Sequence, residues 1–254
     1  MINWIGFSTL TYREISRFFS VWRQTIVPGL ITSGLYMIIF GLTLQKRISE
    51  IDGVSYTIYI LPGLIMMNVI TNALNNTASS MLQMKLLQQM QDMLITPLSN
   101  FEMALAFIIG GTLRGFINGI LVLLLGMFLV QMPVEKPLLV LFLLFIVSWA
   151  FSSAGLLVGI LSETWDNIAT ILNFFVTPLI FLGGVFYSID MLPPFWRQIS
   201  LVNPIYYVIN GLRYSILNIG DTSFSISIIM TIFMTIVFTS ISIWLFKIGF
   251  RIKN

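Results

Sequence analysis

The sequence predicts an all-α membrane protein with six transmembrane helices, an N-terminal amphipathic interface helix and a re-entrant helical segment between spans five and six. Three observations lead to this prediction. Of the 254 residues, 57% are hydrophobic and 9% are charged, which is unlike a soluble domain. Several apolar runs approach the ~20 residues with which a helix crosses a bilayer. The segment 188–213 is too apolar for an open loop, and prolines divide it into pieces too short to span.

Composition also excludes several function classes. Cysteine and histidine are absent, so there is no disulfide framework, thiol nucleophile, Cys/His metal site or Ser-His-Asp triad. The net charge of +3 offers no footprint for nucleic acid. No GxxxxGK[ST] phosphate loop occurs, and no predicted span carries a mid-membrane carboxylate or histidine for ion coupling. We therefore expect a protein that is not an enzyme, binds no cofactor and takes its energy from a partner.

Residues 1–23 predict a helix lying in the plane of the membrane interface. Six residues recur at helical spacing, and all but Thr11 are large and apolar: Trp4, Phe7, Thr11, Ile15, Phe18 and Trp22. Other faces carry the polar side chains of Arg13, Glu14, Arg17 and Ser20. A long apolar run follows without a small-residue cleavage site, which argues against a signal peptide.

The predicted spans form one domain over residues 1–254. They cover about 26–44, 56–78, 101–131, 138–161, 168–187 and 224–246. Within the third span, glycines recur every four residues at 111, 115 and 119, and the fourth span repeats this at 155 and 159. Such spacing leaves one helix face without side chains and predicts close helix–helix contact.

Two polar features lie inside the spans. One face of the second span carries Asn68, Asn72, Asn75 and Ser79, which either join helices by hydrogen bonds or line a polar path. Arg114 lies well inside the third span, with Asn118 one turn on as its nearest candidate partner. An arginine at this depth either faces protein and water or snorkels to the interface. A desolvated arginine would suit an anionic substrate headgroup.

Two connections stand out between the spans. Residues 81–100 favour a helix that ends near Thr96-Pro97 and is too polar to span. It is either a plain surface link or a docking helix for a cytoplasmic partner. The second connection is the short acidic turn SETWDN, residues 162–167.

Basic residues set the predicted orientation. Six spans place both termini on one side. Seven basic residues fall on that side, against five on the other. The seven are Arg13, Arg17, Arg23, Lys85, Lys247, Arg251 and Lys253, and the five are Lys46, Arg47, Lys136, Arg197 and Arg213. We therefore expect cytoplasmic termini and an outer location for residues 188–213.

This outer segment predicts two short helices that meet near Asn203-Pro204. Asn203 and Asn210 would satisfy backbone groups at the turn, and Arg197 and Arg213 would mark its water-facing ends. The segment is either an outer gate or a packed structural cap.

The sequence resembles the ABC-2 type transport permeases over nearly its whole length. The most specific stretches are LGGVFYSIDMLPPFW (182–196) and NPIYYVINGLRY (203–214). DMLITPLSN resembles the cytoplasmic loop before the third span, and WDNIATILNFFVTPL resembles the entry to the fifth. The resemblance is strongest to bacterial inner-membrane permeases that work with a separate ATPase. It implies a dimerising exporter subunit, with membrane lipid around it and ATP and Mg held by the ATPase.

Three groups of site residues follow from these observations together. The ATPase-coupling group is Leu86, Leu87, Met90, Leu94, Pro97, Glu163, Trp165 and Asp166. The translocation path is Asn72, Asn75, Arg114, Asn173 and Thr177. The outer gate is Pro193, Pro194, Phe195, Trp196, Pro204, Tyr207 and Arg213. An intramembrane enzyme would need convergent acid, base or metal groups that the spans lack, so the alternative is a scaffold that assembles an ATPase or another partner without moving substrate.

Overall fold

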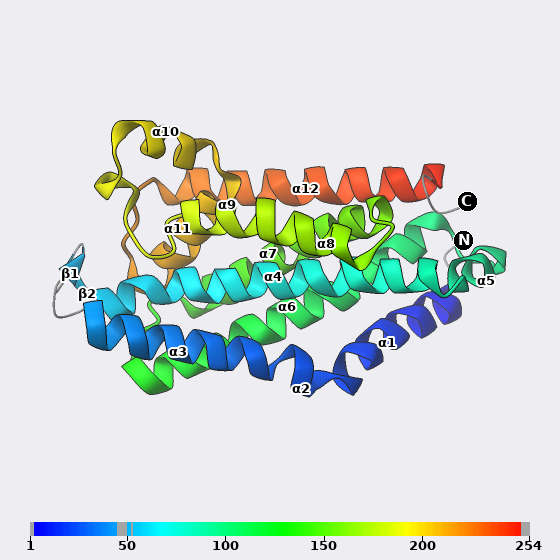
Figure 1. Cartoon of the computed structure of the whole chain (residues 1–254), viewed down its shortest axis with the longest axis horizontal. Coiled ribbons are helices and arrows are strands. Elements are labelled where there is room, and N and C mark those ends of the chain that lie inside the picture. Colours follow the sequence, from blue (N-terminus) through cyan, green and yellow to red (C-terminus); the bar gives the residue numbers. More distant parts are fainter. Residues whose placement is uncertain (1–2, 45–49, 52, 250–254) are drawn as a thin grey trace.

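The computed structural model describes residues 3–44, 50–51 and 53–249 as a bundle whose helices follow the long axis of the molecule (Figure 1). The long helices are α1 (Trp4–Ser20), α3 (Val27–Leu44), α4 (Tyr56–Leu86), α6 (Asn100–Val130), α7 (Pro137–Leu161) and α12 (Phe224–Ile248). One further long helix combines α8 (Trp165–Ile171), a π-helical segment (Leu172–Val176) and α9 (Thr177–Leu182). The short elements are α2 (Trp22–Thr25), β1 (Glu50–Ile51), β2 (Val54–Ser55), α5 (Gln89–Ile95), a 3-10 turn (Ile189–Met191), α10 (Pro194–Val202) and α11 (Pro204–Leu217).

The predicted all-α membrane class is confirmed. Among the described residues, five helices are long and apolar enough to cross a membrane: α4, α6, α7, the combined helix 165–182 and α12. The first predicted span coincides with α3, which is helical over 18 residues. The second helix continues to Leu86, beyond the predicted end at residue 78, and the fifth ends at Leu182 rather than 187. Six membrane crossings remain a prediction.

Capping and proline set several helix boundaries. α6 begins with a capping box in which the Glu102 N–H donates to Ser99 Oγ and the Ser99 N–H donates to the Glu102 carboxylate at 2.7 Å. Pro137, Pro194 and Pro204 stand at the first positions of α7, α10 and α11, where the missing N–H costs nothing. α5 ends at Ile95, as the Thr96-Pro97 break predicts.

Helix α4 is the centre of the bundle. In its most apolar window 78% of residues are buried inside the chain, against 11% for the combined helix 165–182. The glycine faces of α6 and α7 both pack on α4, as their spacing predicted. A Cβ on Gly115 would lie 2.7 Å from the Ala73 Cβ, and one on Gly159 would lie 2.7 Å from the Met81 Cβ. Only glycine permits this separation of the helices.

The two ends of the bundle carry different elements (Figure 1). At one end, which we call the α5 end, α1 begins and α12 finishes beside the start of α6. The Asn3 N–H donates to Glu102 Oε1 at 2.6 Å, and Asn100 Nδ2 donates to the Lys247 carbonyl oxygen at 3.3 Å. The described chain ends therefore lie together, as an even number of spans predicted. Of the basic residues in the orientation argument, Lys46, Arg47, Arg251 and Lys253 lie outside the described residues.

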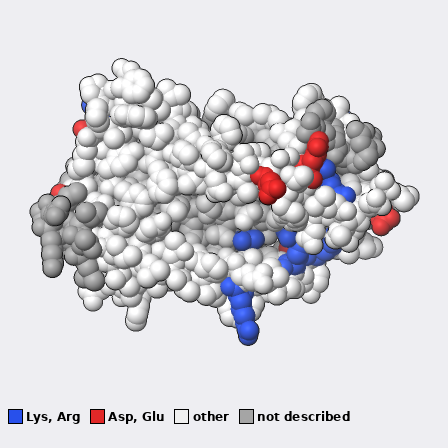
Figure 2. All heavy atoms as spheres, viewed as in Figure 1, with Lys and Arg blue, Asp and Glu red and all other residues white. Residues whose placement is uncertain are grey.

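The opposite end, which we call the α10 end, holds the β1–β2 pair, the α6–α7 link, α10 and α11. Strands β1 and β2 are antiparallel, with Glu50 opposite Ser55. The backbone N–H groups of Glu135 and Lys136 donate to the last turn of α11 at 3.1 and 3.0 Å. Figure 2 shows one face of the molecule, where charged atoms gather toward the α5 end while most of the remaining surface is uncharged. This distribution suits a surface that faces lipid.

Candidate functional site

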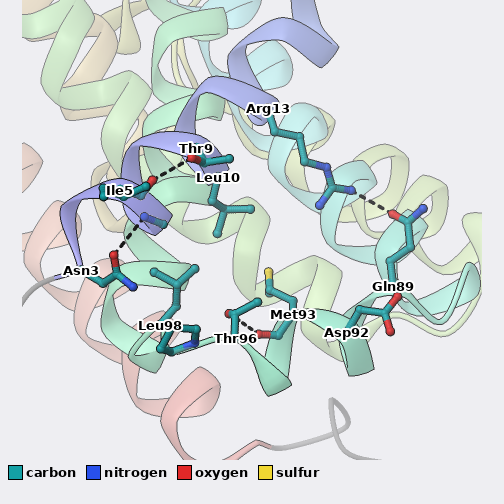
Figure 3. A pocket seen from close by; sticks show the side chains of 12 residues that line it. Asn3, Ile5, Thr9, Leu10, Arg13, Gln89, Asp92, Met93, Thr96 and Leu98 are labelled. Atoms are coloured by element: carbon teal, nitrogen blue, oxygen red, sulfur yellow. Dashed lines mark hydrogen bonds between the residues drawn. The ribbon is translucent and has the colours of Figure 1, made fainter.

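A pocket of about 820 Å³ lies between α1 and α5 at the α5 end. Leu10, Met93 and Leu98 point into it, and Arg13 reaches across from α1 to donate to Gln89 Oε1 at 2.9 Å (Figure 3). Apolar side chains thus form the inner wall, while polar groups bridge the rim. The interface helix and the predicted docking helix are therefore parts of one surface.

The structure divides the ATPase-coupling residues into exposed and buried members. Leu86 and Leu87 are 51% and 56% exposed, and Leu94 is half-buried. Met90 corrects the prediction: it is only 2% exposed and packs in a methionine-rich core with Met81 and Met84. Its side chain anchors α5 to the bundle and is not available to a partner. Ile95, which the sequence argument omitted, is 82% exposed on the same helix.

The acidic turn adjoins this surface through Lys85. The Lys85 ammonium, at the last turn of α4, donates to the carbonyl oxygens of Ile160 and Ser162 at 2.9 and 2.7 Å. A cation here meets the carbonyl end of α7, where the helix dipole favours positive charge. Three predicted coupling residues beside it are exposed: Glu163, Trp165 and Asp166. The exposed Pro97 completes the set on the far side of α5.

Arg114 reaches from α6 to the asparagine face of α4. Its Nε and Nη2 donate to Asn72 Oδ1 at 3.2 and 3.1 Å, and its Nη1 donates to Asn76 Oδ1 at 3.4 Å. The predicted partner Asn118 is wrong, because its amide donates to the Arg114 backbone carbonyl instead. Asn75, the other predicted member on α4, is exposed. The guanidinium therefore lies against protein and not along the helix toward the interface.

This polar cluster continues into α1. Glu14 is fully buried, accepts from Ser80 Oγ at 2.6 Å and lies 3.5 Å from the Arg17 guanidinium. Arg17 in turn donates to the Asn76 backbone and side-chain oxygens at 3.0 and 3.2 Å. Burial lowers the pKa of Arg17 from its ordinary value, and the charge of Glu14 opposes that change. Glu14 thus points inward together with Leu10 and Phe18, while Trp4 and Trp22 are exposed.

The remaining predicted path residues lie on a different helix. Asn173 is exposed in the π-helical segment, and Thr177 is half-buried at the start of α9. Phe174 and Phe175 beside them are 75% and 63% exposed. In the described part of the chain, no hydrogen bond joins Asn173 or Thr177 to the Arg114 cluster. The structure therefore separates the predicted path into two places.

The outer segment forms two helices that meet at Asn203-Pro204, as predicted. Asn203 Nδ2 donates to the Leu179 carbonyl oxygen at 2.6 Å, and its Oδ1 accepts from the Ile205 N–H. α10 is largely exposed, including Phe195 and Trp196. The exposed prolines at its start are Pro193 and Pro194. α11 is mostly buried after its half-buried Pro204, and the Tyr207 hydroxyl ties it to α10 by donating to the Leu201 carbonyl oxygen at 2.8 Å.

Two predictions for this segment are wrong. Arg213 does not face water: it is 0% exposed, lies 4.1 Å from the Tyr59 ring centroid and 4.0 Å from Asp221, and donates to the Gly184 carbonyl oxygen at 2.6 Å. Asn210 does not serve the turn at Asn203; it bonds the residues before α12. Arg197 is exposed, as predicted, and pairs with Asp190 at 2.6 Å.

Comparison with known proteins settles the family. The family model described as "ABC-2 type transporter" matches residues 6–217. The inner membrane transport permease YadH of Escherichia coli K12 is 40% identical over 235 residues, which cover 91% of this chain and 92% of that protein. The chain belongs to the ABC-2 type transporter family.

Two more distant relatives match over a similar share of the chain. The putative transport permease ycf38 of Cyanophora paradoxa is 25% identical over 240 residues, covering 88% of this chain and 81% of the relative. Nodulation protein J of Rhizobium leguminosarum bv. viciae is 23% identical over 221 residues, covering 85% and 83%. The predicted family is thus confirmed, and this ABC-2 chain is the transmembrane subunit of an ABC transporter. Membership in this family implies an ABC ATPase as partner.

Proposed function

We propose that this chain is the permease subunit of an ATP-driven exporter in the bacterial inner membrane. Two copies form a homodimer that carries two separate ATPase chains, which hold ATP and Mg. The α5 end faces the cytoplasm, and the dimer moves an amphiphilic, glycan or lipid-linked substrate outward. YadH is named a transport permease and ycf38 a putative one, which supports transport by this chain.

The surface at the α5 end is the observation that carries this proposal. Exposed Leu86, Leu87 and Ile95 lie beside the α1–α5 pocket, within one end of the bundle. Exposed apolar side chains at a polar helix are unfavourable in water and suit a protein partner. Because Lys85 joins the α4–α5 link to the end of α7, a partner that moves α5 would also move the turn before α8.

Charge supports the cytoplasmic placement of this end. The elements at the α5 end and the adjacent α2 carry basic residues, among them Arg13, Arg23, Lys85 and Lys247. Basic residues near span ends favour the cytoplasmic side. At the α10 end the described basic residues are Lys136 and the buried or paired residues of the outer segment.

The homodimer is supported by the helix 165–182. Its apolar window is 11% buried inside one protomer, yet it exposes Asn173 near its middle. An amide facing lipid lacks hydrogen-bond partners, and π-helical segments often mark functional positions. We propose that this face meets the second copy and that Asn173 and Thr177 line the substrate path between copies. α10 and α11 would then close the outer side as a gate.

Co-purification with the ATPase tests the proposal. We expect the wild-type permease to retain its ATPase in detergent, and Leu87→Glu and Ile95→Glu each to weaken retention about tenfold or more, because each places an unpaired charge in an apolar contact. Ser223→Asp is the control, since it adds the same charge at the opposite end, at the N-cap of α12 where an acid is tolerated.

Two results would contradict the proposal. One is a permease that never retains an ATPase, even after crosslinking. The other is equal retention by Leu87→Glu, Ile95→Glu and Ser223→Asp, which would remove the α5 surface from the interface. If the ATPase binds but vesicles show no ATP-dependent substrate transfer, the scaffold alternative holds instead.

A further inference from the structure

The buried cluster around Arg114 has an excess of positive charge. Arg17 and Glu14 form an ion pair at 3.5 Å. Arg114 has only amide oxygens as acceptors, from Asn72 and Asn76. Within the described residues, no carboxylate lies within 4.0 Å of its guanidinium. An arginine inside a membrane protein usually pairs with another charged residue or with backbone carbonyls, and the described residues offer the Arg114 guanidinium no carboxylate.

The cluster also holds donors without acceptors. Arg17 Nε and Asn76 Nδ2 are buried and have no hydrogen-bond partner in the described structure. Buried donors are normally satisfied by protein, water or ligand. One acceptor, Glu14 Oε1, is likewise unpaired, so the internal carboxylate is not arranged to satisfy them. An oxygen-rich anion on the arginine side of the cluster would supply acceptors for these donors.

A route from the surface reaches Asn72. A crevice of about 180 Å³ lies between α3 and α4, and its polar wall includes Ser33, Asn68 and Asn72. Asn72, whose Oδ1 accepts from Arg114, is thus shared between the cluster and this wall. Leu64 and Met67 provide its apolar wall. Figure 2 shows a recess beside α4 with basic atoms at its floor.

We propose that Arg114, with Arg17 and the amides of Asn72 and Asn76, binds the phosphate group of an anionic amphiphile whose chains lie along the α3–α4 crevice. The guanidinium fork matches two phosphate oxygens, and the apolar crevice wall takes the adjoining chain. The inference rests on the proposed function, because it assigns a substrate headgroup to the exporter. It excludes a neutral glycan headgroup as the group bound here.

Ligand-dependent thermal stability tests the site without the ATPase. Purified permease in a maltoside detergent is titrated with dihexanoyl phosphatidic acid. We expect Tm to rise with concentration, because a ligand that binds only the folded state stabilises it. Arg114→Gln should raise the apparent Kd about tenfold or more, and Arg114→Lys should give an intermediate value because it keeps the charge and loses the fork. Arg23→Gln is the control, since Arg23 is exposed beside Trp22 and should bind as wild type.

A second variant tests the site even if Arg114→Gln does not fold. Asn72→Asp keeps the arginine and gives it an internal carboxylate, so it should fold and lose phosphatidate binding. Equal loss in Arg23→Gln and Arg114→Gln would overturn the site in favour of general surface charge. An equal Tm rise with inorganic phosphate alone would overturn the amphiphile, and no rise with phosphatidic acid in the wild type would overturn the proposal.

The same preparations separate this inference from the proposed function. Retained ATPase without phosphatidate binding would remove the headgroup site and leave the exporter proposal in place. Phosphatidate binding without any ATPase would remove the exporter proposal and leave an anionic lipid site on a membrane protein.

Discussion

Gly155→Ala should destabilise the contact between α4 and α7. A Cβ at this position would lie 3.0 Å from both the Cα and the carbonyl carbon of Leu74, with the carbonyl oxygen nearer still. These are backbone atoms, so no rotamer change can relieve the clash, and α7 must move away from α4. Overpacking of this kind costs about 1–3 kcal/mol. We expect a corresponding loss of stability in thermal unfolding of the detergent-solubilised protein.

Gly34→Ala is a matched control on α3. Its nearest new contact would be Leu125 Cδ2 at 3.5 Å, an ordinary van der Waals distance. The same added methyl should therefore change stability by less than about 0.5 kcal/mol. Equal Tm values for Gly155→Ala and Gly34→Ala would refute the reasoning that backbone contact with α4 requires glycine in α7.

Three further outcomes follow from the buried and exposed groups. Lys85→Met removes a charged group from the end of α7 and should cost about 1–3 kcal/mol in the same thermal assay; an unchanged Tm would contradict this. Arg213→Gln leaves Asp221 buried without its cation and should cost about 3 kcal/mol, and adding Asp221→Asn should cost less than the sum of both changes; simple additivity would mean the pair does not interact. With single cysteines, a membrane-impermeant thiol reagent should label Gln198→Cys and spare Val202→Cys, although both side chains are exposed in the protomer, because Val202 adjoins the Asn203-Pro204 turn in the middle of the re-entrant segment. Equal labelling would mean an ordinary loop.

The helices were predictable because length and residue spacing directly determine them. The spacing of Gly111, Gly115 and Gly119 predicted a close helix contact, and a Cβ at any of the three would collide with α4 side chains. The Asn203-Pro204 turn was predictable because proline suits the first position of a helix and asparagine caps it. Both inferences depend only on the type and spacing of neighbouring residues, which can be read directly from the sequence.

The direction in which α5 faces was not predictable from composition. Met90 and Leu94 have similar hydrophobicity, yet Met90 is in the core and Leu94 is half-buried. The deciding contact is with Met84 and other core methionines across the α4–α5 link. Gln88, which adopts a left-handed backbone conformation with φ of 57°, turns the chain at this link. Because residues other than glycine rarely adopt this conformation, the glutamine did not indicate a turn. The direction in which α5 faces therefore could not be predicted from the sequence.

The pairing of Arg213 with Asp221 could not be predicted from the sequence for a different reason. Asp221 lies eight residues later, in the link before α12, and no helical spacing joins the two. Asp221 also accepts from Ser188 Oγ at 2.9 Å and from the Ile189 N–H at 3.2 Å. The carboxylate thus connects three segments, and such a meeting point appears only after the chain has folded.

The burial of Glu14 in α1 follows from the membrane as solvent. For a helix on a soluble protein, the large apolar side chains mark the buried face. In a bilayer, lipid accepts apolar side chains, while charged groups gain by facing protein. Glu14 is accordingly buried and Trp4 is 67% exposed, and Arg213 on α11 obeys the same rule. A buried charge in a chain like this one therefore marks a face that packs on protein, and the excess cation at Arg114 is our guide to a ligand.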